Sequence, residues 1–412
     1  MQKKLLVLLT SVFPYDSGEE FLEVELPYLA ASFTRVIILP VHQLNPKKLT
    51  RKLPQNVEAR SLRSCVPACK TAGIGLRAVS GWVRSPLLSP IPAALQMRAL
   101  TSGRYRFELA KNALSDVDFS RYDQAVFYGY WMAKPAMIAY WLSEWAKEFT
   151  ETKCASRAHR FDVYQDQAPF GYLPARSFLG KHLDAAFPIS KNAKDVLSRD
   201  MGDSMRAAMS IQRLGTRPLP EVRREKTGRL NIVSLSSLAP VKRLDLAARG
   251  IAQALRRGVD LHWYHIGGAK AEQVEELKGL LDELQISESV TLVGQLPHEE
   301  ALNFLADPKL SVFMNTSSSE GVPVSIMEAL GCSLPTVCTD VGGSGELVEE
   351  GVNGSLLAAD IQPNDLAEIL DRWYRMGQDE YARFSKNARN TWEEKCDARN
   401  VYPKLIAEME QM

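Results

Sequence analysis

The chain has 412 residues, a length that exceeds what a single hydrophobic core usually supports, so we expect two domains. Apolar residues make up 45% and charged residues 24%, the balance of an ordinary globular protein. The formal net charge of +1 gives no global attraction to nucleic acid, and no apolar run approaches the roughly 18 residues of a membrane-spanning helix.

The first apolar run imitates a short signal peptide. It ends at Thr10-Ser11, however, and Phe13-Pro14-Tyr15 follows without a small-residue cleavage pattern. We therefore expect Lys4–Thr10 to form a buried strand.

From there, short apolar strands alternate with amphipathic helices in two successive halves. Such alternation is typical of parallel, doubly wound sheets. The expected strands are Lys4–Thr10, Arg35–Pro40, Gln124–Phe127, Thr152–Arg157 and Ala185–Ile189, then Leu230–Leu235, Asp260–Ile266, Val290–Val293, Leu310–Asn315 and Thr336–Asp340. Helices are expected between them, for example over Leu244–Arg257 and Glu272–Leu284.

Residues 59–107 contain many basic residues and no acidic one. The eight basic residues are Arg60, Arg63, Lys70, Arg77, Arg84, Arg98, Arg104 and Arg106, with apolar residues between them. This pattern suits an anionic membrane surface or a diphosphate-bearing lipid. A solvated loop followed by a basic helix would explain it equally well.

Six cysteines are too few for a disulfide framework in a chain of this length. Cys65 and Cys69 are closely spaced, but no second pair or nearby histidine completes a zinc site. We expect free thiols.

A linker is expected between the two halves, over residues 213–229. Pro218, Pro220 and a charge cluster lie there without an apolar period. The expected domains are residues 1–212 and 230–385, and a C-terminal helix of about residues 386–412 is expected to pack back on the first domain.

The segment from Glu320 to Glu328 is the most informative part of the second half. Pro323 suits the first position of a helix, and the preceding strand would bring this helix to the carboxyl edge of the sheet, where ligands bind. The free N–H groups of Val324 and Ser325 and the helix dipole could then bind a diphosphate. Lys242 follows an earlier strand and could add a full positive charge.

The two glutamates do not have the spacing of a hydrolase pair. Carboxyl groups in retaining glycosidases lie about 5–5.5 Å apart, whereas eight residues of helix rise about 12 Å. The two side chains are expected to contact different parts of one long ligand.

The block continues through Gly342-Gly343-x-x-Glu346 and Gly351-x-x-Gly354. With Glu320-x7-Glu328, it resembles the retaining glycosyltransferases of family four, in particular the bacterial branch that builds colanic-acid-like exopolysaccharides. Weaker matches occur earlier, at Phe13-Pro14-Tyr15, Tyr128-x-Tyr130-Trp131 and Ser156-Arg157-Ala158-His159-x-Phe161-Asp162. The resemblance implies an α/β GT-B fold, in which two Rossmann-like doubly wound domains face a central cleft.

The resemblance also implies roles for residues of the second domain, which would bind the donor. Glu320 would lie near the donor sugar, Glu328 would bind the ribose hydroxyls and Lys242 the phosphates. Backbone N–H groups of Gly321 and Val322 would meet sugar hydroxyls, and Gln295 would contact the base.

The chain departs from the family pattern at two places. Many members carry an arginine beside the phosphate-binding lysine, where this chain has Ser237. Ser237 can donate one hydrogen bond but no charge, and Arg243 is the expected substitute. The glycine-rich loop after the first strand is reduced to Ser17-Gly18-Glu19.

On the first, acceptor-side domain, His159 is the expected contact for the donor sugar or the acceptor. It joins Glu320 and Lys242 as an expected catalytic residue. Arg157 is predicted to bind an acceptor phosphate, and Asp162 to orient His159 or form a structural pair. Gly18 and Glu19 are weaker candidates for the acceptor side.

The predicted reaction is a retaining transfer from a nucleotide diphosphate sugar, UDP-linked or alternatively GDP-linked, without metal or cofactor. The expected acceptor is a glycan or a polyprenyl-diphosphate-linked saccharide in bacterial surface polysaccharide synthesis. We expect the enzyme in the cytoplasm or at the inner face of the cell membrane. A sugar-nucleotide epimerase and an inactive nucleotide-sugar-binding scaffold remain as alternatives. A nicotinamide dehydrogenase is disfavoured because neither half has Gly-x-Gly-x-x-Gly after its first strand.

Overall fold

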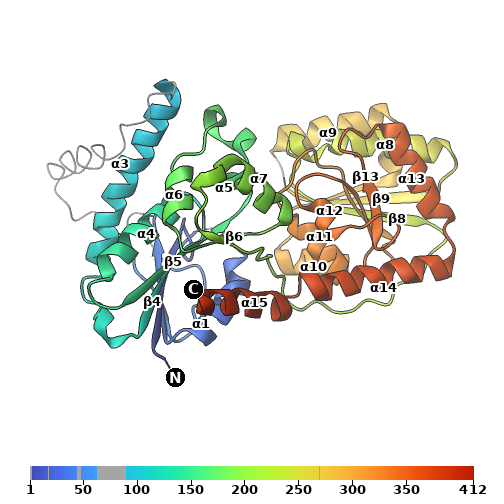
Figure 1. Ribbon diagram of the computed structural model, residues 1–412. Coiled ribbons are helices and arrows are strands. Elements are labelled where there is room, and N and C mark those ends of the chain that lie inside the picture. The colour runs from blue at the N-terminus through green and yellow to red at the C-terminus, as the bar shows by residue number, and fades with distance from the viewer. Residues whose placement is uncertain (1, 17, 44–47, 63–89, 269) are drawn as a thin grey trace. The chain divides into compact units, whose positions relative to one another are not determined.

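A computed structural model describes residues 2–16, 18–43, 48–62, 90–268 and 270–412. The chain divides into two compact α/β units (Figure 1). Unit 1 comprises Met1–Leu214 together with Val401–Met412, and unit 2 comprises Gly215–Asn400.

Unit 1 is built on a seven-stranded parallel sheet with the strand order β3-β2-β1-β4-β5-β6-β7. Its strands are β1 Lys4–Thr10, β2 Arg35–Pro40, β3 Val57–Ala59, β4 Gln124–Gly129, β5 Glu151–Ala158, β6 Ala185–Pro188 and β7 Ala208–Met209. The central strands read as continuous apolar runs because helices cover both faces of a parallel sheet. Leu5 to Leu9 of β1 accordingly have no exposed surface.

The connections of unit 1 contain the helices α1 Leu22–Ser32, α3 Pro90–Ala113, α4 Lys134–Ala146, α5 Arg160–Val163, α6 Arg176–His182 and α7 Lys191–Met201. α4 packs against β1, β4 and β5 and covers one face of the sheet centre. α15, Ala398–Gln411, starts in unit 2, and its residues from Val401 on belong to unit 1. Within unit 1 the ring of Tyr402 lies 5.2 Å from that of Tyr28.

Unit 2 contains a six-stranded parallel sheet with the order β10-β9-β8-β11-β12-β13. Its strands are β8 Leu230–Leu235, β9 Leu261–Ile266, β10 Val290–Gly294, β11 Val312–Asn315, β12 Thr336–Thr339 and β13 Gly354–Leu357. The buried core of this unit includes Trp263, Leu281 and Trp373.

The helices of unit 2 form two layers around this sheet (Figure 1). They are α8 Leu244–Arg256, α9 Ala271–Glu283, α10 His298–Leu305, α11 Val324–Gly331, α12 Ser344–Leu347, α13 Pro363–Arg375 and α14 Gln378–Lys395. α8 contacts α9 and α13 in one layer, and α11 contacts α10, α12 and α14 in the other. Two parallel sheets with helices on both faces confirm the predicted Rossmann-like, doubly wound fold.

In each unit the strand order reverses at the first strand. The reversal lies between β1 and β4 in unit 1 and between β8 and β11 in unit 2. Loops that leave the carboxyl ends of such neighbouring strands run in opposite directions and leave a crevice that binds ligands in folds of this class. We call these two reversals of strand order the switch points. Ligand-binding residues are therefore expected in the loops after β1, β4, β8 and β11.

Candidate functional site

Lys242 and Glu320 meet at the switch point of unit 2. Lys242 lies in the loop after β8, and Glu320 lies in the loop after β11. The Lys242 Nζ atom donates to Glu320 Oε1 over 2.6 Å. Two residues that are distant in sequence therefore share one charged contact at the place where this fold binds ligands.

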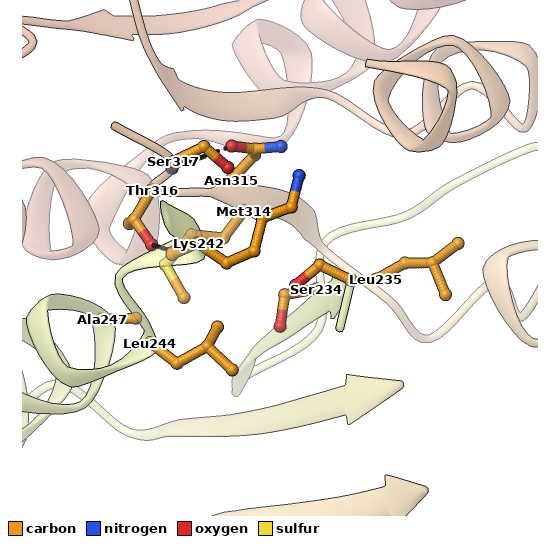
Figure 2. A pocket seen from close by; sticks show the side chains of 10 residues that line it. Ser234, Leu235, Lys242, Leu244, Ala247, Met314, Asn315, Thr316 and Ser317 are labelled. Atoms are coloured by element: carbon orange, nitrogen blue, oxygen red, sulfur yellow. Dashed lines mark hydrogen bonds between the residues drawn. The ribbon is translucent and has the colours of Figure 1, made fainter. Parts of the chain in front are cut away.

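A pocket opens beside this contact (Figure 2). Its walls come from β8 and the following loop, the start of α8, and β11 with its following loop, and they include Ser234, Ser236, Lys242, Met314 and Ser317. The lining is polar at the strand ends and apolar toward the core, which is typical of small-molecule sites.

The Glu320 carboxylate is buried and held by several donors. Besides Lys242, Ser317 Oγ donates over 2.6 Å and Asn315 Nδ2 over 3.3 Å, and all three bonds reach Oε1. Oε2 has no hydrogen-bond donor within the described ranges. The ion is therefore stabilised on one oxygen while the other can accept a bond from a ligand.

A second turn supports the backbone of Glu320 and Gly321. Gly343 N donates to Gly321 O over 2.6 Å. Gly342 has a φ of +58°, and a Cβ atom there would lie 1.8 Å from the carbonyl oxygen of Glu320. Only glycine fits at this contact, which explains the Gly342-Gly343 sequence on physical grounds.

α11 begins at Val324, one residue later than predicted, and Pro323 caps it from outside. The N–H groups of Ile326 and Met327 bond to the Pro323 carbonyl. Those of Val324 and Ser325 have no acceptor in the part of the chain that the structure describes. The predicted pair of free donors is thus present at a helix N-terminus, where an anion is favoured.

Glu328 lies on α11 and is buried, with 4% of its surface exposed. His298, the first residue of α10, places its Nε2 atom 2.6 Å from Glu328 Oε1. The His298 side chain is 61% exposed, so the buried Glu328 carboxylate has a partner that lies at the surface. The sequence prediction missed His298, since only its position after β10 at the same sheet edge could have indicated it.

Arg243 does not act as the predicted substitute for the missing family arginine. Its guanidinium donates to the backbone carbonyls of Thr316, Ala359 and Ser317 over 2.7, 2.8 and 3.2 Å. These bonds hold the loop after β11 in place. The Arg243 guanidinium is therefore not available to bind the donor. Ser237 is exposed at the sheet edge.

Gln295 is also exposed, directly after β10. Its side chain lies against Gly268, where a Cβ atom would come within 2.3 Å of the Gln295 amide oxygen. The structure thus places Gln295 at the same sheet edge as the other candidates.

In unit 1, His159 lies at the start of α5 among three aromatic rings. The imidazole centroid lies 4.5 Å from that of Trp131, 5.0 Å from that of Tyr130 and 6.0 Å from that of Phe21. The side chain is buried, yet neither ring nitrogen has a hydrogen-bond partner among the described residues. Burial, assisted by the positive charge of Arg157, lowers the pKa of His159 well below its usual value, so the ring is neutral.

Asp162 positions the backbone next to His159. Its carboxylate accepts from His159 N over 2.5 Å and from Met132 N over 2.6 Å. Burial raises the pKa of Asp162 to about 7 despite these bonds. The carboxylate thus bonds to two backbone N–H groups, and it has neither the predicted bond to the imidazole nor an ion pair among the described residues.

The prediction for Arg157 is wrong. Arg157 is fully buried, and its Nη2 atom lies 3.0 Å from Glu25 Oε2, whose side chain is also fully buried. Arg157 also donates to the Tyr128 hydroxyl and to the Gln212 carbonyl. A group without solvent access and with these partners cannot receive an acceptor phosphate.

The prediction for Glu19 is also wrong. Its carboxylate accepts from the N–H groups of Ser11, Val12 and Phe13 at 2.8–3.1 Å and from Trp131 Nε1 at 2.6 Å. The Glu19 carboxylate therefore binds the N–H groups of the turn after β1 and is not available to an acceptor. Gly18, with φ +104°, provides the reversal that this requires.

Most of the predicted basic stretch, including Arg63, Lys70, Arg77 and Arg84 as well as Cys65 and Cys69, lies outside the described residues. α3 contains Arg98, Arg104 and Arg106. Four cysteines elsewhere, Cys154, Cys332, Cys338 and Cys396, are buried and belong to no disulfide bond. Within the described ranges, no group of histidine, cysteine and acidic residues could hold a metal ion, and no helix could span a membrane.

Comparison with known proteins gives a consistent result. Residues 217–391 match the family model described as glycosyl transferases group 1. WcaL of Escherichia coli K12, named for colanic acid biosynthesis, is 28% identical over 247 residues, which cover 58% of this chain and 59% of WcaL. The amylovoran biosynthesis glycosyltransferase AmsK of Erwinia amylovora is 30% identical over 147 residues, 35% of either chain. The matches thus span less than two thirds of these relatives.

Solved structures extend the fold comparison over the whole chain. The Anabaena protein HepE in complex with UDP aligns with a TM-score of 0.65 and 16% identity, covering 99% of this chain and 100% of HepE. The lipopolysaccharide outer core galactosyltransferase WaaB aligns with a TM-score of 0.69 and 13% identity, covering 99% and 100%. The fold is the GT-B fold of glycosyltransferases.

Proposed function

We propose, from the premise that residues 217–391 belong to the glycosyl transferases group 1 family, that this chain is a glycosyltransferase of bacterial surface polysaccharide synthesis. The proposed reaction moves a sugar from a nucleotide diphosphate to a glycan or to a polyprenyl-diphosphate-linked saccharide. UDP is the preferred nucleotide of the donor because HepE binds UDP, and GDP is the alternative.

The observation that carries this proposal is the arrangement of Lys242, Glu320 and the N-terminus of α11 around one switch point. A nucleotide diphosphate sugar offers two negative phosphates between two sets of hydroxyl groups. In our proposal Lys242 and the N–H groups of Val324 and Ser325 bind the phosphates. Glu328 accepts from the ribose hydroxyls, and Glu320 with the N–H groups of Gly321 and Val322 contacts the sugar.

The proposed transfer retains the configuration of the sugar without a covalent enzyme intermediate. Glu320 suits this mechanism because Lys242, Ser317 and Asn315 withdraw charge from one of its oxygens, which makes it a weak nucleophile. As the glycosidic bond breaks, negative charge grows on the leaving diphosphate. Lys242 and the helix N-terminus are fixed beforehand where they stabilise that charge.

Unit 1 is proposed to bind the acceptor. In this proposal His159 makes the contact, since a neutral imidazole whose ring nitrogens have no partner among the described residues can both donate to and accept from a sugar hydroxyl. Because the ring is buried, acceptor binding must open access to it. The Asp162 bond to its backbone fixes where the ring lies.

An inactive nucleotide-sugar-binding protein is the second candidate. It is favoured by one observation: the position beside Lys242 that usually carries arginine has Ser237, and Arg243 bonds to backbone carbonyls instead. Such a protein would bind a nucleotide sugar without consuming it.

The test begins with thermal unfolding of the full chain in the presence of a panel of nucleotides and nucleotide sugars. One diphosphate class should raise the midpoint, and Glu328→Ala should reduce that rise, while Glu299→Ala, at an exposed neighbouring helix position, should not. The stabilising donor is then incubated alone and with bacterial lipid extract. Consumption only with the extract supports transfer, isomerised donor in its absence supports an epimerase, and no consumption supports the inactive protein.

A further inference from the structure

Basic side chains gather at the carboxyl edge of the unit 1 sheet. Lys134 is the first residue of α4 and follows β4, and His42 follows β2. Arg106 of α3 donates from Nε to the carbonyl of Val41 over 2.7 Å, so its guanidinium lies beside His42. Arg98 lies two turns earlier on α3 and is close enough to Lys134 to lower its pKa. We call His42, Arg98, Arg106 and Lys134 the cationic cluster.

No carboxylate neutralises the cluster within the described part of the chain. Lys134, Arg98 and Arg106 form no ion pair there, and the sequence has no acidic residue from Ala59 to Phe107. The carboxylate of Glu19 lies in the neighbouring turn, but four N–H donors hold it, and the carboxylate of Asp16 accepts from Gln43. Like charges without a counter-charge destabilise one another, and a bound anion would offset that cost.

The pKa values show how strongly these groups interact. Burial, with Arg106 and Arg98, lowers the pKa of Lys134 to about 8. Burial, with Lys134 and Arg106, lowers the pKa of His42 to about 4. His42 and Arg98 are exposed, whereas Arg106 and Lys134 are half-buried, so the cluster lies at the surface with two of its members partly enclosed.

The location of the cluster is that of a ligand site. β2, β1 and β4 are neighbours in the sheet, and the strand order reverses between β1 and β4. The His42 Nδ1 atom lies 3.1 Å from the hydroxyl of Ser11, which follows β1, so the loops after all three strands take part. α4 has thirteen residues and directs its positive end toward Lys134.

We propose that the cationic cluster binds a phosphate or diphosphate ester group of the acceptor. That the ligand is the acceptor rests on the function proposed above. That an anion binds here rests on the cluster alone. Arg98 offers a guanidinium fork that matches phosphate oxygens, and Lys134 adds a point charge. Arg106 adds its positive charge and Nη2, since its Nε and Nη1 atoms donate to the carbonyls of Val41 and Ser102. Together these groups suit a ligand with two or more negative charges. The ester could belong to a lipid or to a free sugar phosphate.

The experiment uses the full chain saturated with the nucleotide that it binds best, so that Lys242 and α11 are occupied. Calorimetric titration is then performed with inorganic pyrophosphate and with geranyl diphosphate. Wild type should show one further site, and Lys134→Gln should weaken it at least tenfold. Lys181→Gln, an exposed lysine of α6 in the same unit, should bind like wild type.

Thermal unfolding of the variants distinguishes binding from structure. Lys134→Gln removes a partly buried charge that has no ion pair among the described residues, so its midpoint should equal or exceed that of wild type. Tighter binding of geranyl diphosphate than of pyrophosphate would identify a lipid-linked ester, and equal binding would identify the phosphate group alone. Wild-type affinity in Lys134→Gln, or no further site, overturns the proposal. A failure of all nucleotides to bind would instead refute the donor site, and pyrophosphate titration of the unsaturated chain would then still test the cluster.

Discussion

The amino group of Lys242 lies 2.6 Å from Oε1 of Glu320, and both side chains are largely withdrawn from solvent. When one partner of a largely buried ion pair is removed, the other charge remains without a counter-charge. The two residues are therefore coupled in stability as well as in their proposed roles toward the donor.

We predict that Lys242→Met weakens binding of the nucleotide diphosphate about 10- to 100-fold, because a charge-assisted hydrogen bond contributes about 1.5–3 kcal/mol. The variant should also unfold at a lower temperature, since Glu320 loses its counter-charge. Combining it with Glu320→Gln should restore most of the unfolding midpoint but not the affinity. If the double variant recovered both, Lys242 would be only a structural partner of Glu320.

Glu320→Ala and Glu328→Ala should separate turnover from nucleotide binding. Loss of Glu328 should raise the dissociation constant of the free nucleotide about tenfold or more, because it removes an acceptor for the ribose hydroxyls. Loss of Glu320 should reduce kcat much more than it changes that dissociation constant. Calorimetry and transfer assays measure the two effects. Near-wild-type transfer by both variants would contradict the proposed roles.

His298→Ala should weaken nucleotide binding through Glu328. The Nε2 atom of His298 lies 2.6 Å from the Glu328 carboxylate and orients it. The expected loss is about three- to tenfold for UDP, as for one hydrogen bond, and it should disappear for 2′-deoxy and 3′-deoxy nucleotides, which lack a ribose hydroxyl. Glu300→Ala, on the same helix and exposed, serves as the control. An equal loss for all nucleotides would indicate a general structural defect.

Arg157→Met should destabilise unit 1 by about 3–5 kcal/mol, because it leaves Glu25 charged and unpaired in the core. Burial raises the pKa of Glu25, so this cost should become smaller at low pH, where the carboxyl group is protonated. Urea unfolding at pH 7 and pH 5 provides the measurement. A stable Arg157→Met protein with a specific loss of acceptor use would restore the original sequence prediction.

The stability of the protein should depend on pH through His159. Its pKa is lowered in the folded chain by burial, so the ring contributes stability above the unfolded-state pKa of about 6.5 and loses it as the pH falls further. Between pH 6.5 and 5 the free energy of unfolding should fall by up to about 1.4 kcal/mol per pH unit more in wild type than in His159→Asn. Equal slopes in both proteins would mean that the ring is not buried in solution.

The fold was predictable from sequence because its central strands are apolar runs of ordinary length. β1, β2 and β8 have the predicted boundaries. The strands β3 and β7 were missed because two or three residues carry too little pattern to be distinguished from loops. β13 was missed because it begins with Gly354-Ser355, which is typical of a turn.

The site was predictable only where backbone position decides the outcome. Lys242, Glu320 and Glu328 were placed correctly at one sheet edge because each follows or opens a recognisable element. Arg157 and Glu19 were misjudged because the partners of a side chain depend on contacts that are distant in sequence, with Glu25 in one case and Trp131 in the other. His298 and Lys134 gave no signal except their place after a strand.

Unit 1 is discontinuous in sequence, since Val401–Met412 belongs to it. In this segment Tyr402, Leu405 and Met409 are buried. A ribosome delivers these residues only after it has synthesised unit 2, so unit 2 can fold while unit 1 still lacks part of its core. During that interval the surface of nascent unit 1 that Tyr402, Leu405 and Met409 will cover stays exposed to solvent.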